Sequence, residues 1–405
     1  MNLSSVFTRR DIENAFRVLR RRRFKKDFGE LTRFTGADER ELNTLGRYLN
    51  TISPSRYWRG LRNHRLKPYR GIRIAKKNGT FRPLLIPHAQ DRVVLTAAFP
   101  KIRGVLIREL GEYGALGVGV KRTSDTTEFK KVSNEILGLI RAGKADFILK
   151  LDFKDFFSSV NRRRLIKSLR RLFKNKRDRY VLNLIEKSIK NDIDADAVFW
   201  NTFRPLNLKK IGIPQGLAYS PILASFYALA LDVVVRNAEG MTSYRYLDDM
   251  IVICATKNEA EAVYEIVKKK SEEIGLYLHP LELGSKTRLV STRNEAFEFL
   301  GIGISEEGLF IPEDAIKKFK ATFEEEILNG RIIKECTLTE VLSVYKKFAR
   351  GWANHYRAIC PEDFERVSTN LEEYLDKYVA SRRDRFRFMG PHRLTLSRHF
   401  LRIAG

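Results

Sequence analysis

Residues 243–254 read SYRYLDDMIVIC, in which two adjacent aspartates interrupt a run of strand-forming residues. The alternation before the pair and the apolar run after it are typical of two short β-strands. Neighbouring side chains on a regular strand face opposite sides of the sheet, so a tight turn at Leu247–Asp248 is needed to present both carboxylates at a hairpin tip. Two carboxylates held close raise each other's pKa unless a cation neutralises them. The stretch therefore predicts a hairpin that carries part of a site for a divalent metal ion.

A second candidate for that site is Asp152, which follows the apolar strand pattern of FILKLDF at residues 147–153. Two strand-borne aspartates from distant parts of a chain are the usual ligands of a two-metal phosphoryl-transfer site. A lone aspartate at the end of a strand is also a common turn former or helix cap. The pattern by itself leaves both interpretations open.

The charge of the chain points to its partners. Its 405 residues carry a formal net charge of +27, and 43% of them are hydrophobic. That length predicts two or three folding units with buried cores. A charge excess of this size repels itself in a compact fold, and a polyanionic partner relieves the repulsion. Nucleic acid is the first candidate and an anionic membrane is the second.

The cysteines and the first residues bear on the compartment. Cys254, Cys336 and Cys360 are the only cysteines, and they form no CxxC pair or Cys/His cluster. This argues against a disulfide framework and a zinc site, and it suits a reducing cytoplasm. The opening MNLSSVFTRRD has no long apolar stretch, so we expect no secretory signal.

One stretch has nearly the length of a membrane-spanning helix. Residues 211–231 carry no formal charge. Pro214 and Pro221 break the first half, so a soluble core helix that starts near Ser220 is the better interpretation. We expect Ser220 to act as its N-cap and Pro221 to occupy the first helical position.

Periodicity predicts a basic helical start, a mixed α/β middle and a helical tail, and thus an α+β fold. Asn78–Gly79 predicts a hairpin between strands in residues 72–87. Helices are expected over about 89–110, 161–173 and 257–274. The segments FEFLGIGIS and GLFIP are expected to pair across Glu306–Glu307. Six residues recur at helical spacing in the tail: Leu338, Leu342, Tyr345, Ala349, Trp352 and Tyr356.

Three of these segments, in order, resemble the core palm motifs of reverse transcriptases: LKLDFKDFF (149–157), GIPQGLAYSPILASFYALALD (212–232) and YRYLDDMIV (244–252). The segment 72–94 is similar to the fingers hairpin of that family. LGSKTRLV (283–290) resembles its lysine-bearing motif, and FEFLGIGI (297–304) its primer grip. FARGWANHYR (348–357) is similar to the thumb helix of group II intron-type enzymes.

The resemblance implies a right-hand polymerase fold with fingers, palm and thumb. On this basis residues 1–70 form a basic helical extension and 71–145 the fingers. Residues 146–312 form the palm, with a finger insertion around 161–210, and 313–405 form a helical thumb and C-terminal extension.

The resemblance also assigns catalytic roles. Asp152 and Asp248 would be the main ligands of two Mg²⁺ ions, for which Mn²⁺ is a possible substitute. Asp249 would support them, and the backbone carbonyl of Phe153 would complete the coordination. Lys286 would protonate the leaving pyrophosphate, although a surface lysine before a strand is also common.

Further residues would contact the nucleotide and the nucleic acid. The hairpin cations Lys76 or Lys77 and Arg82 would bind the triphosphate. Phe157 would lie against the 2′ position of the sugar and exclude ribonucleotides. Gln215 and Gly216 would lie near the nascent base pair. The candidates for backbone contacts are Arg20, Arg21, Arg22, Lys346, Lys347 and Arg350, of which the first three lie in a charge run that could equally be a solvated helix face.

The implied activity is RNA-directed DNA synthesis with an RNA template, dNTPs and a DNA product. YGALGVGVKRTSD departs from the template-contacting sequence of intron-type enzymes, no VTG triplet follows the lysine motif, and little chain follows the thumb. We therefore expect a stand-alone bacterial enzyme that works with a noncoding RNA in antiviral defence. The alternatives are a group II intron-type maturase and a non-templated nucleotidyltransferase. No basic helix with a clean apolar face argues for a membrane partner.

Overall fold

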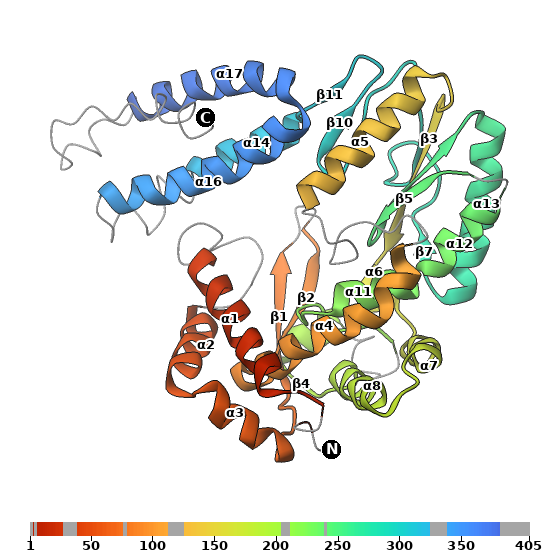
Figure 1. Cartoon of the computed structure of the whole chain (residues 1–405). Helices are drawn as coiled ribbons and strands as arrows, with labels where there is room; N and C mark the ends of the chain where they lie inside the picture. Colours follow the sequence, from red (N-terminus) through yellow and green to blue (C-terminus); the bar gives the residue numbers. More distant parts are fainter. Residues whose placement is uncertain are drawn as a thin grey trace. The chain divides into compact units, whose positions relative to one another are not determined.

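Figure 1 shows the computed structural model of the chain, which describes residue 3 and residues 6–26, 39–75, 79–111, 125–203, 211–238, 241–324 and 338–380. The chain forms two compact units. The first unit comprises Met1–Lys25, Arg33–Arg122 and Phe147–Leu289, and the second comprises Lys26–Thr32, Thr123–Asp146 and Val290–Gly405. Lys76, Lys77 and Cys336 lie outside the described residues, as do the side chains of Arg21, Arg22, Lys346 and Lys347.

An antiparallel sheet forms the centre of the first unit. Its strands are β5 (Ser243–Tyr246), β6 (Asp249–Cys254), β3 (Phe147–Lys154) and β7 (Tyr277–Leu278), in that spatial order, and β8 (Arg288–Ser291) also pairs with β3. The apolar residues of β6 are all buried, because α13 (Lys257–Ile274) packs against β3, β6 and β7. The register places Asp152 of β3 opposite Asp249 of β6. The sheet therefore brings together the two aspartate-bearing segments.

A second sheet in this unit contains the predicted hairpin. β1 (Tyr69–Ala75) pairs antiparallel with β2 (Phe81–Ile86), and β4 (Ile193–Asp194) runs parallel to β1. Gly79 has a φ of 76°, the left-handed conformation that favours glycine in a tight turn. The prediction of a hairpin in residues 72–87 is confirmed.

Helices surround these sheets, and several begin and end where the sequence pattern predicts. α4 spans Ala89–Gly111 and α7 spans Arg162–Leu172, where the Asn161 side chain caps the first turn by accepting from the N–H of Arg164. The remaining helices of the unit are α1 (Arg9–Lys26), α2 (Glu39–Thr51), α3 (Pro54–Gly60), η2 (Leu61–Asn63), α6 (Phe156–Ser159), α8 (Lys176–Ile189), α9 (Ala197–Thr202), α11 (Ser220–Tyr227) and α12 (Leu229–Asn237).

The prediction that Ser220 caps its helix is wrong. Ser220 is the first residue of α11, and its hydroxyl donates to the carbonyl of Pro214 at 2.5 Å. The loop before the helix has buried the serine, so a backbone carbonyl rather than a helix N–H is its nearest partner. Pro221 does lie in the first turn, and the helical stretch is divided at Ala228. Within the described residues, no helix is both long enough and apolar enough to span a membrane.

The second unit combines a small sheet with helices. β9 (Phe297–Phe299), β10 (Ile302–Ile304) and β11 (Leu309–Phe310) form an antiparallel sheet, which confirms the predicted pairing across Glu306–Glu307. Leu300 and Gly301 join β9 to β10 with positive φ angles of 57° and 77°. This is the two-residue turn that matches the twist of a hairpin.

In the described part of this unit the sheet is accompanied by α5 (Asp125–Arg141), α14 (Glu313–Thr322), α16 (Leu338–Ile359) and α17 (Pro361–Ala380). The predicted helix in the tail is confirmed by α16, whose Trp352 ring lies 4.9 Å from that of Phe319 in α14. The Tyr356 hydroxyl donates to the carbonyl of Gly301 at 3.1 Å. An Asp363 oxygen accepts from the N–H of Ile311 at 2.7 Å, which attaches α17 to the end of β11.

Candidate active site

The aspartate pair lies in a strained turn between β5 and β6. Tyr246 and Asp249 are the last paired residues, and Leu247 and Asp248 form the connection. Leu247 has a φ of 59°, a left-handed conformation that costs a bulky residue about 1–3 kcal/mol. The predicted hairpin with Asp248 at its tip is confirmed. Surrounding contacts must hold the turn against this strain.

Arg245 supplies those contacts from inside the protein. Its Nε and Nη2 donate to the two carboxylate oxygens of Asp232 at 2.8 and 2.5 Å, and both side chains are buried. Its Nη1 donates to the carbonyl of Leu247 at 3.1 Å. Burial raises the pKa of the Asp232 carboxyl, and the Arg245 charge acts in the opposite direction. One guanidinium therefore neutralises a buried acid and fixes the strained turn.

Asp152 lies beside this hairpin on β3 and is held by the segment that follows β7. Its backbone carbonyl accepts from the N–H of His279 at 3.0 Å, and its own N–H donates to the Thr287 hydroxyl at 3.2 Å. His279 Nε2 and Lys286 Nζ lie 3.3 and 3.5 Å from the same carboxylate oxygen. Lys286, predicted from the sequence, thus lies in the site, and its side chain is 64% exposed.

The three aspartates affect one another electrostatically. Burial raises the pKa of Asp248, the charge of Asp152 raises it further, and the charges of Arg82 and Lys286 lower it. Burial likewise raises the pKa of Asp249 to about 6, while the Lys150 charge opposes this and both other aspartates add to it. Asp248 and Asp249, whose ionisation burial and neighbouring acids disfavour, thus lie together with Asp152 at the end of two adjoining strands.

Lys150 and Lys286 supply positive charge at these acids. Lys150 Nζ lies 3.6 Å from Asp249 Oδ1, a buried oxygen without a hydrogen-bond partner among the described residues.

Within the described ranges, no group of three or more His, Cys, Asp or Glu side chains converges on one point as a ready metal site. The donors available are nevertheless carboxylate oxygens, one of them unsatisfied, and this chemistry suits Mg²⁺. The residues therefore fit such an ion.

Phe157 follows β3 in the chain, and a hydrogen bond joins it to the loop before α11. Phe157 lies on α6, half-buried, with its ring packed edge-on against Phe156 at 5.7 Å. Its carbonyl accepts from the N–H of Ile213 at 2.9 Å, and the carbonyl of Gln215 accepts from the N–H of Leu85 at 2.7 Å. The first bond links α6 to the 211–217 loop, and the second links that loop to β2, which carries the exposed Arg82.

Comparison with known proteins identifies the family. Residues 74–304, which contain all three aspartates, match the model described as reverse transcriptase (RNA-dependent DNA polymerase). The chain belongs to this family. The predicted α+β fold of the right-hand polymerase type is confirmed. No curated protein matches the chain.

Solved structures of telomerases are similar to this reverse transcriptase family member. One is telomerase from Candida albicans in complex with a TWJ fragment of telomeric RNA, at 16% identity and a TM-score of 0.46, covering 90% of this chain and 65% of that chain. Another is apo telomerase from Candida tropicalis truncated from the C-terminal domain, at 13% identity and a TM-score of 0.43, covering 61% of this chain and 56% of that chain. The present chain thus corresponds to less than two thirds of either chain's length.

Sequence reasoning missed Arg245, Asp232 and His279. The sequence carried no signal for Arg245, because alternation with two tyrosines would turn the rings inward, whereas the structure buries the arginine. Arg20, whose contact with nucleic acid stays a prediction, is exposed, and its Nη2 donates to the carbonyl of Leu49 at 2.7 Å, which joins α1 to α2. Arg350 is exposed on α16.

Gly216 allows the loop before α11 to approach β2. It has a φ of 129°, and a Cβ at this position would lie 2.3 Å from the carbonyl oxygen of Leu85. We expect Gly216→Ala to lower the free energy of unfolding by about 2–4 kcal/mol, measured by urea denaturation. The control is Gly104→Ala inside α4, where a Cβ meets open space and should stabilise by about 0.5–1 kcal/mol. A Gly216→Ala protein as stable as the wild type would contradict the close approach.

The raised pKa of Asp249 predicts a pH dependence of stability. Between its ordinary value of 3.8 and about 6, the folded protein keeps a proton that the unfolded chain has released. Stability therefore falls as the pH rises through this window, and the loss is complete above it. In urea denaturation with EDTA, Asp249→Asn should remove this part of the slope. Identical slopes in both proteins would show that Asp249 does not carry it.

Proposed function

We propose that this chain is an RNA-directed DNA polymerase that extends a primer along an RNA template. The observation that carries the proposal is the gathering of Asp152, Asp248 and Asp249 at the ends of β3 and β6 within the region that matches the family. A nucleotidyl transfer reaction needs concentrated negative charge at one point to hold divalent cations, and these three acids provide it.

The acids would act together with the nearby cations. Asp152 and Asp248 would hold two Mg²⁺ ions, with support from Asp249 and the Phe153 carbonyl; the ions supply a lowered pKa at the primer 3′-hydroxyl and neutralisation of the triphosphate. Lys286, 3.5 Å from Asp152 and largely exposed, can donate a proton to the leaving pyrophosphate. Arg82, whose charge lowers the pKa of Asp248, can bind the triphosphate.

Several finer assignments belong to the same proposal. The triphosphate role of Lys76 or Lys77, the base-pair role of Gln215 and Gly216, and the division into fingers, palm and thumb follow from the family pattern. A soluble, cytoplasmic enzyme that uses a dedicated noncoding RNA in antiviral defence is the biological role that we propose.

Phe157 sets the choice between deoxyribonucleotides and ribonucleotides in this proposal. The residue is half-buried, its ring packs edge-on against Phe156, and its backbone carbonyl accepts from the N–H of Ile213, so Phe157 is held in place yet partly accessible. We expect Phe157→Ala to raise the relative use of rNTPs by about 10²-fold in primer extension, because the smaller side chain admits a 2′-hydroxyl. Phe173→Leu, a change at a buried phenylalanine at the end of α7, is the control and should leave the choice of sugar unaltered. Equal rNTP use by the wild type would remove Phe157 from this role.

Primer extension with sequenced products tests the activity itself. A primed RNA of defined sequence is incubated with dNTPs and Mg²⁺, and the expected product is DNA complementary to the template. Products unrelated to the template would favour a non-templated nucleotidyltransferase. RNA binding without incorporation would favour a maturase. Sequencing the nucleic acid that co-purifies with the protein would identify the natural template.

A further inference from the structure

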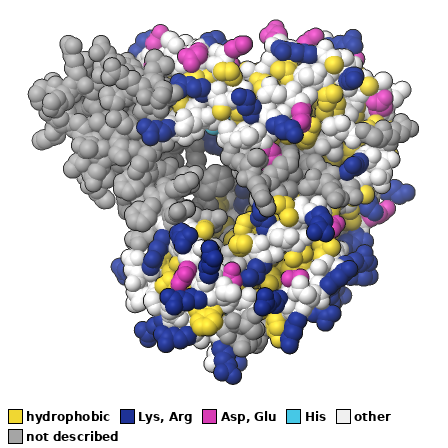
Figure 2. Space-filling model, in the orientation of Figure 1, with side chains coloured by type: hydrophobic (Ala, Val, Ile, Leu, Met, Phe, Trp, Pro, Cys, Tyr) yellow, Lys and Arg dark blue, Asp and Glu magenta, His cyan; other side chains and the backbone are white. Residues whose placement is uncertain are grey.

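The surface formed by α7 and α8 is strongly basic. Residues 162–190 contain twelve Lys and Arg residues but only two acidic residues, Asp178 and Glu186. Every one of these cations except Arg162 is exposed. In Figure 2 the dark-blue side chains of Lys and Arg gather where α7 and α8 lie in Figure 1. We call residues 162–190 the basic face.

Arg170 and Arg171 in the last turn of α7 suit the negative end of its dipole, but the cations at its start do not stabilise the helix. α7 begins with three arginines and has no acidic residue in its first turn, so cations meet the positive end of the helix dipole. Arg163, Lys167 and Arg171 follow one another at intervals of four, and each such like-charged pair destabilises a helix by about 0.2–0.5 kcal/mol. The sequence thus tolerates a local loss of stability here.

α13 shows how the same protein builds an ordinary solvated helix. There lysines and glutamates occur together, and ion pairs join Lys257 to Glu261 and Lys270 to Glu273. On the basic face, by contrast, the buried Arg162 donates to the Gly212 carbonyl, and among the exposed cations the described residues offer partners to Arg164 at the Glu273 carbonyl and to Arg170 and Lys190 at Glu186. The other exposed cations have no side-chain hydrogen bond or ion pair among the described residues: Arg163, Lys167, Arg171, Lys174, Lys176, Arg177, Arg179 and Lys187.

A groove of about 890 Å³ adjoins the basic face. It lies between α8 and residues 62–66, and its lining includes four cations, Arg62, Arg65, Lys187 and Lys190, and two acids, Glu186 and Asp192. Polar amides from Asn63, Asn183 and Asn191 also line it. A sugar–phosphate backbone offers acceptors for both kinds of donor, because its phosphates attract cations and its oxygens accept from amides.

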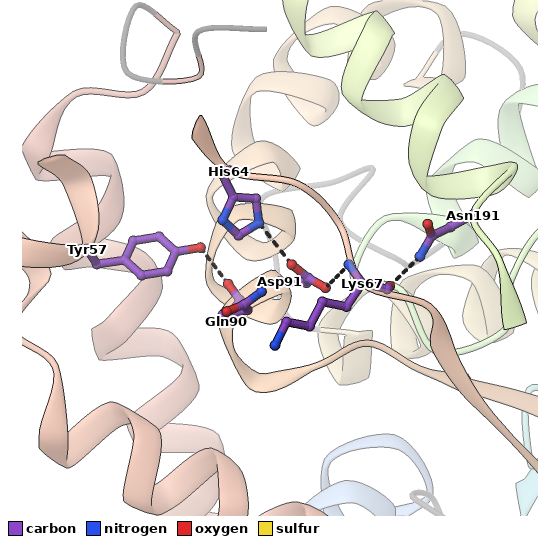
Figure 3. Close-up of polar contacts among 6 residues, drawn as sticks. All are labelled: Tyr57, His64, Lys67, Gln90, Asp91 and Asn191. Atoms are coloured by element: carbon purple, nitrogen blue, oxygen red, sulfur yellow. Dashed lines mark hydrogen bonds and ion pairs between the residues drawn. The ribbon is translucent and has the colours of Figure 1, made fainter. Parts of the chain in front are cut away.

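Hydrogen bonds around the buried Asp91 and at Lys67 fix the wall of this groove (Figure 3). Asp91 is fully buried and lies 2.9 Å from His64 Nε2, and its other oxygen accepts from the N–H of Lys67 at 3.0 Å. Asn191 Nδ2 donates to the carbonyl of Lys67 at 2.6 Å. The segment 64–67 is therefore held between α4 and the end of α8, and the groove is preformed.

We propose that the basic face and the adjoining groove bind the sugar–phosphate backbone of a double-helical segment of RNA, outside the active site. The cations described around Asp152, Asp248 and Asp249 come from β2, β3 and residues 279–286, and none belongs to the basic face. The choice of RNA over DNA rests on the proposed function, since the template must reach the enzyme as a folded RNA.

Two observations select a double helix rather than a single strand or a membrane. None of the exposed large hydrophobic side chains falls within residues 162–190, so the face offers no aromatic platform for unpaired bases. The sequence analysis predicted no basic helix with a clean apolar face, and α7 is such an amphipathic helix. Its Leu165, Ile166 and Leu169, however, are buried in the core. A helix that binds a membrane surface must expose such residues to the lipid.

Binding of a hairpin RNA, measured without nucleotides, tests this proposal. The variant combines Arg163→Gln, Lys167→Gln, Arg171→Gln and Lys174→Gln. Its affinity for the hairpin should fall about 10–100-fold, and the slope of log K against log salt should decrease by about 3, because four phosphate contacts are lost. A second variant, Arg62→Gln with Arg65→Gln and Lys187→Gln, tests the groove and serves if the first fails to fold.

The matched control removes the same charge from α13 through Lys257→Gln, Lys268→Gln, Lys269→Gln and Lys270→Gln. It should lose less than about threefold in affinity, because these lysines face no phosphate. Equal losses of RNA affinity in the basic-face variant and the α13 control would overturn the proposal. So would a basic-face variant that loses affinity for phosphatidylserine vesicles but keeps its affinity for the RNA hairpin. Equal losses on unpaired RNA or on a DNA hairpin of the same sequence would overturn the choice of double-helical RNA. Because no nucleotide is incorporated, the result is independent of whether the chain polymerises DNA.

Discussion

Asp248→Asn is expected to lower DNA synthesis on a primed RNA template by about 10³-fold or more, and Asp152→Asn should do the same. An amide retains the size of the carboxylate but loses the charge that holds a divalent cation, and such a cation contributes several kcal/mol to phosphoryl transfer. Single-turnover primer extension under saturating dNTP measures the effect. Because Asp248 is destabilised by burial and by Asp152, the Asp248→Asn protein should be at least as stable as the wild type.

Asp249→Asn is the graded comparison. Asp249 faces Lys150 and has the weaker role in the proposed coordination, so its amide variant should lose clearly less activity than the other two.

Mg²⁺ should raise the melting temperature of the wild type more than that of Asp248→Asn, since the ion binds the folded site and not the unfolded chain. Full activity in Asp248→Asn, or an equal shift by Mg²⁺ in both proteins, would refute the role of this acid.

Arg245→Met is expected to lower the free energy of unfolding by about 3–5 kcal/mol. The change leaves the Asp232 carboxylate buried without its cation, and an uncompensated buried charge has a cost of this size. It also removes the donor to the Leu247 carbonyl, so the turn that bears Asp248 loses its support. Urea denaturation measures the first effect, and primer extension by the remaining folded protein measures the second.

A double variant separates the two roles of Arg245. Arg245→Met with Asp232→Leu replaces the buried ion pair by apolar groups of similar volume, which is often neutral for stability. Most of the lost stability should return, whereas polymerase activity should not, because the Leu247 carbonyl still lacks its donor. Arg293→Met is the control. It breaks the exposed pair with Asp146 and should cost less than about 1 kcal/mol. Recovery of activity along with stability would show that Arg245 acts through stability alone.

The sequence by itself determined the family, the aspartate hairpin and the bounds of the helices near 89–110, 161–173 and 257–274. These depend on patterns within short segments, such as the alternation of residues 243–246 and the apolar run of β6. Local periodicity reports which face of a strand or helix is buried, so it predicts elements and their turns. The resemblance to reverse transcriptases, in turn, predicted that Asp152 lies near Asp248, because the segments containing them occur together in known members of the family.

Only the tertiary structure decided which polar groups meet. The pairing of Arg245 with Asp232, the approach of His279 to Asp152 and the bond from Ser220 to Pro214 join groups whose partners the sequence pattern does not specify. The partner of a buried polar group is set by which neighbours packing leaves within reach, since desolvation makes an unpaired group unfavourable. The basic face has the same origin. The cations of α7 and α8 are visible in the sequence, but packing buries the apolar side of α7 and leaves the charges on one exposed surface.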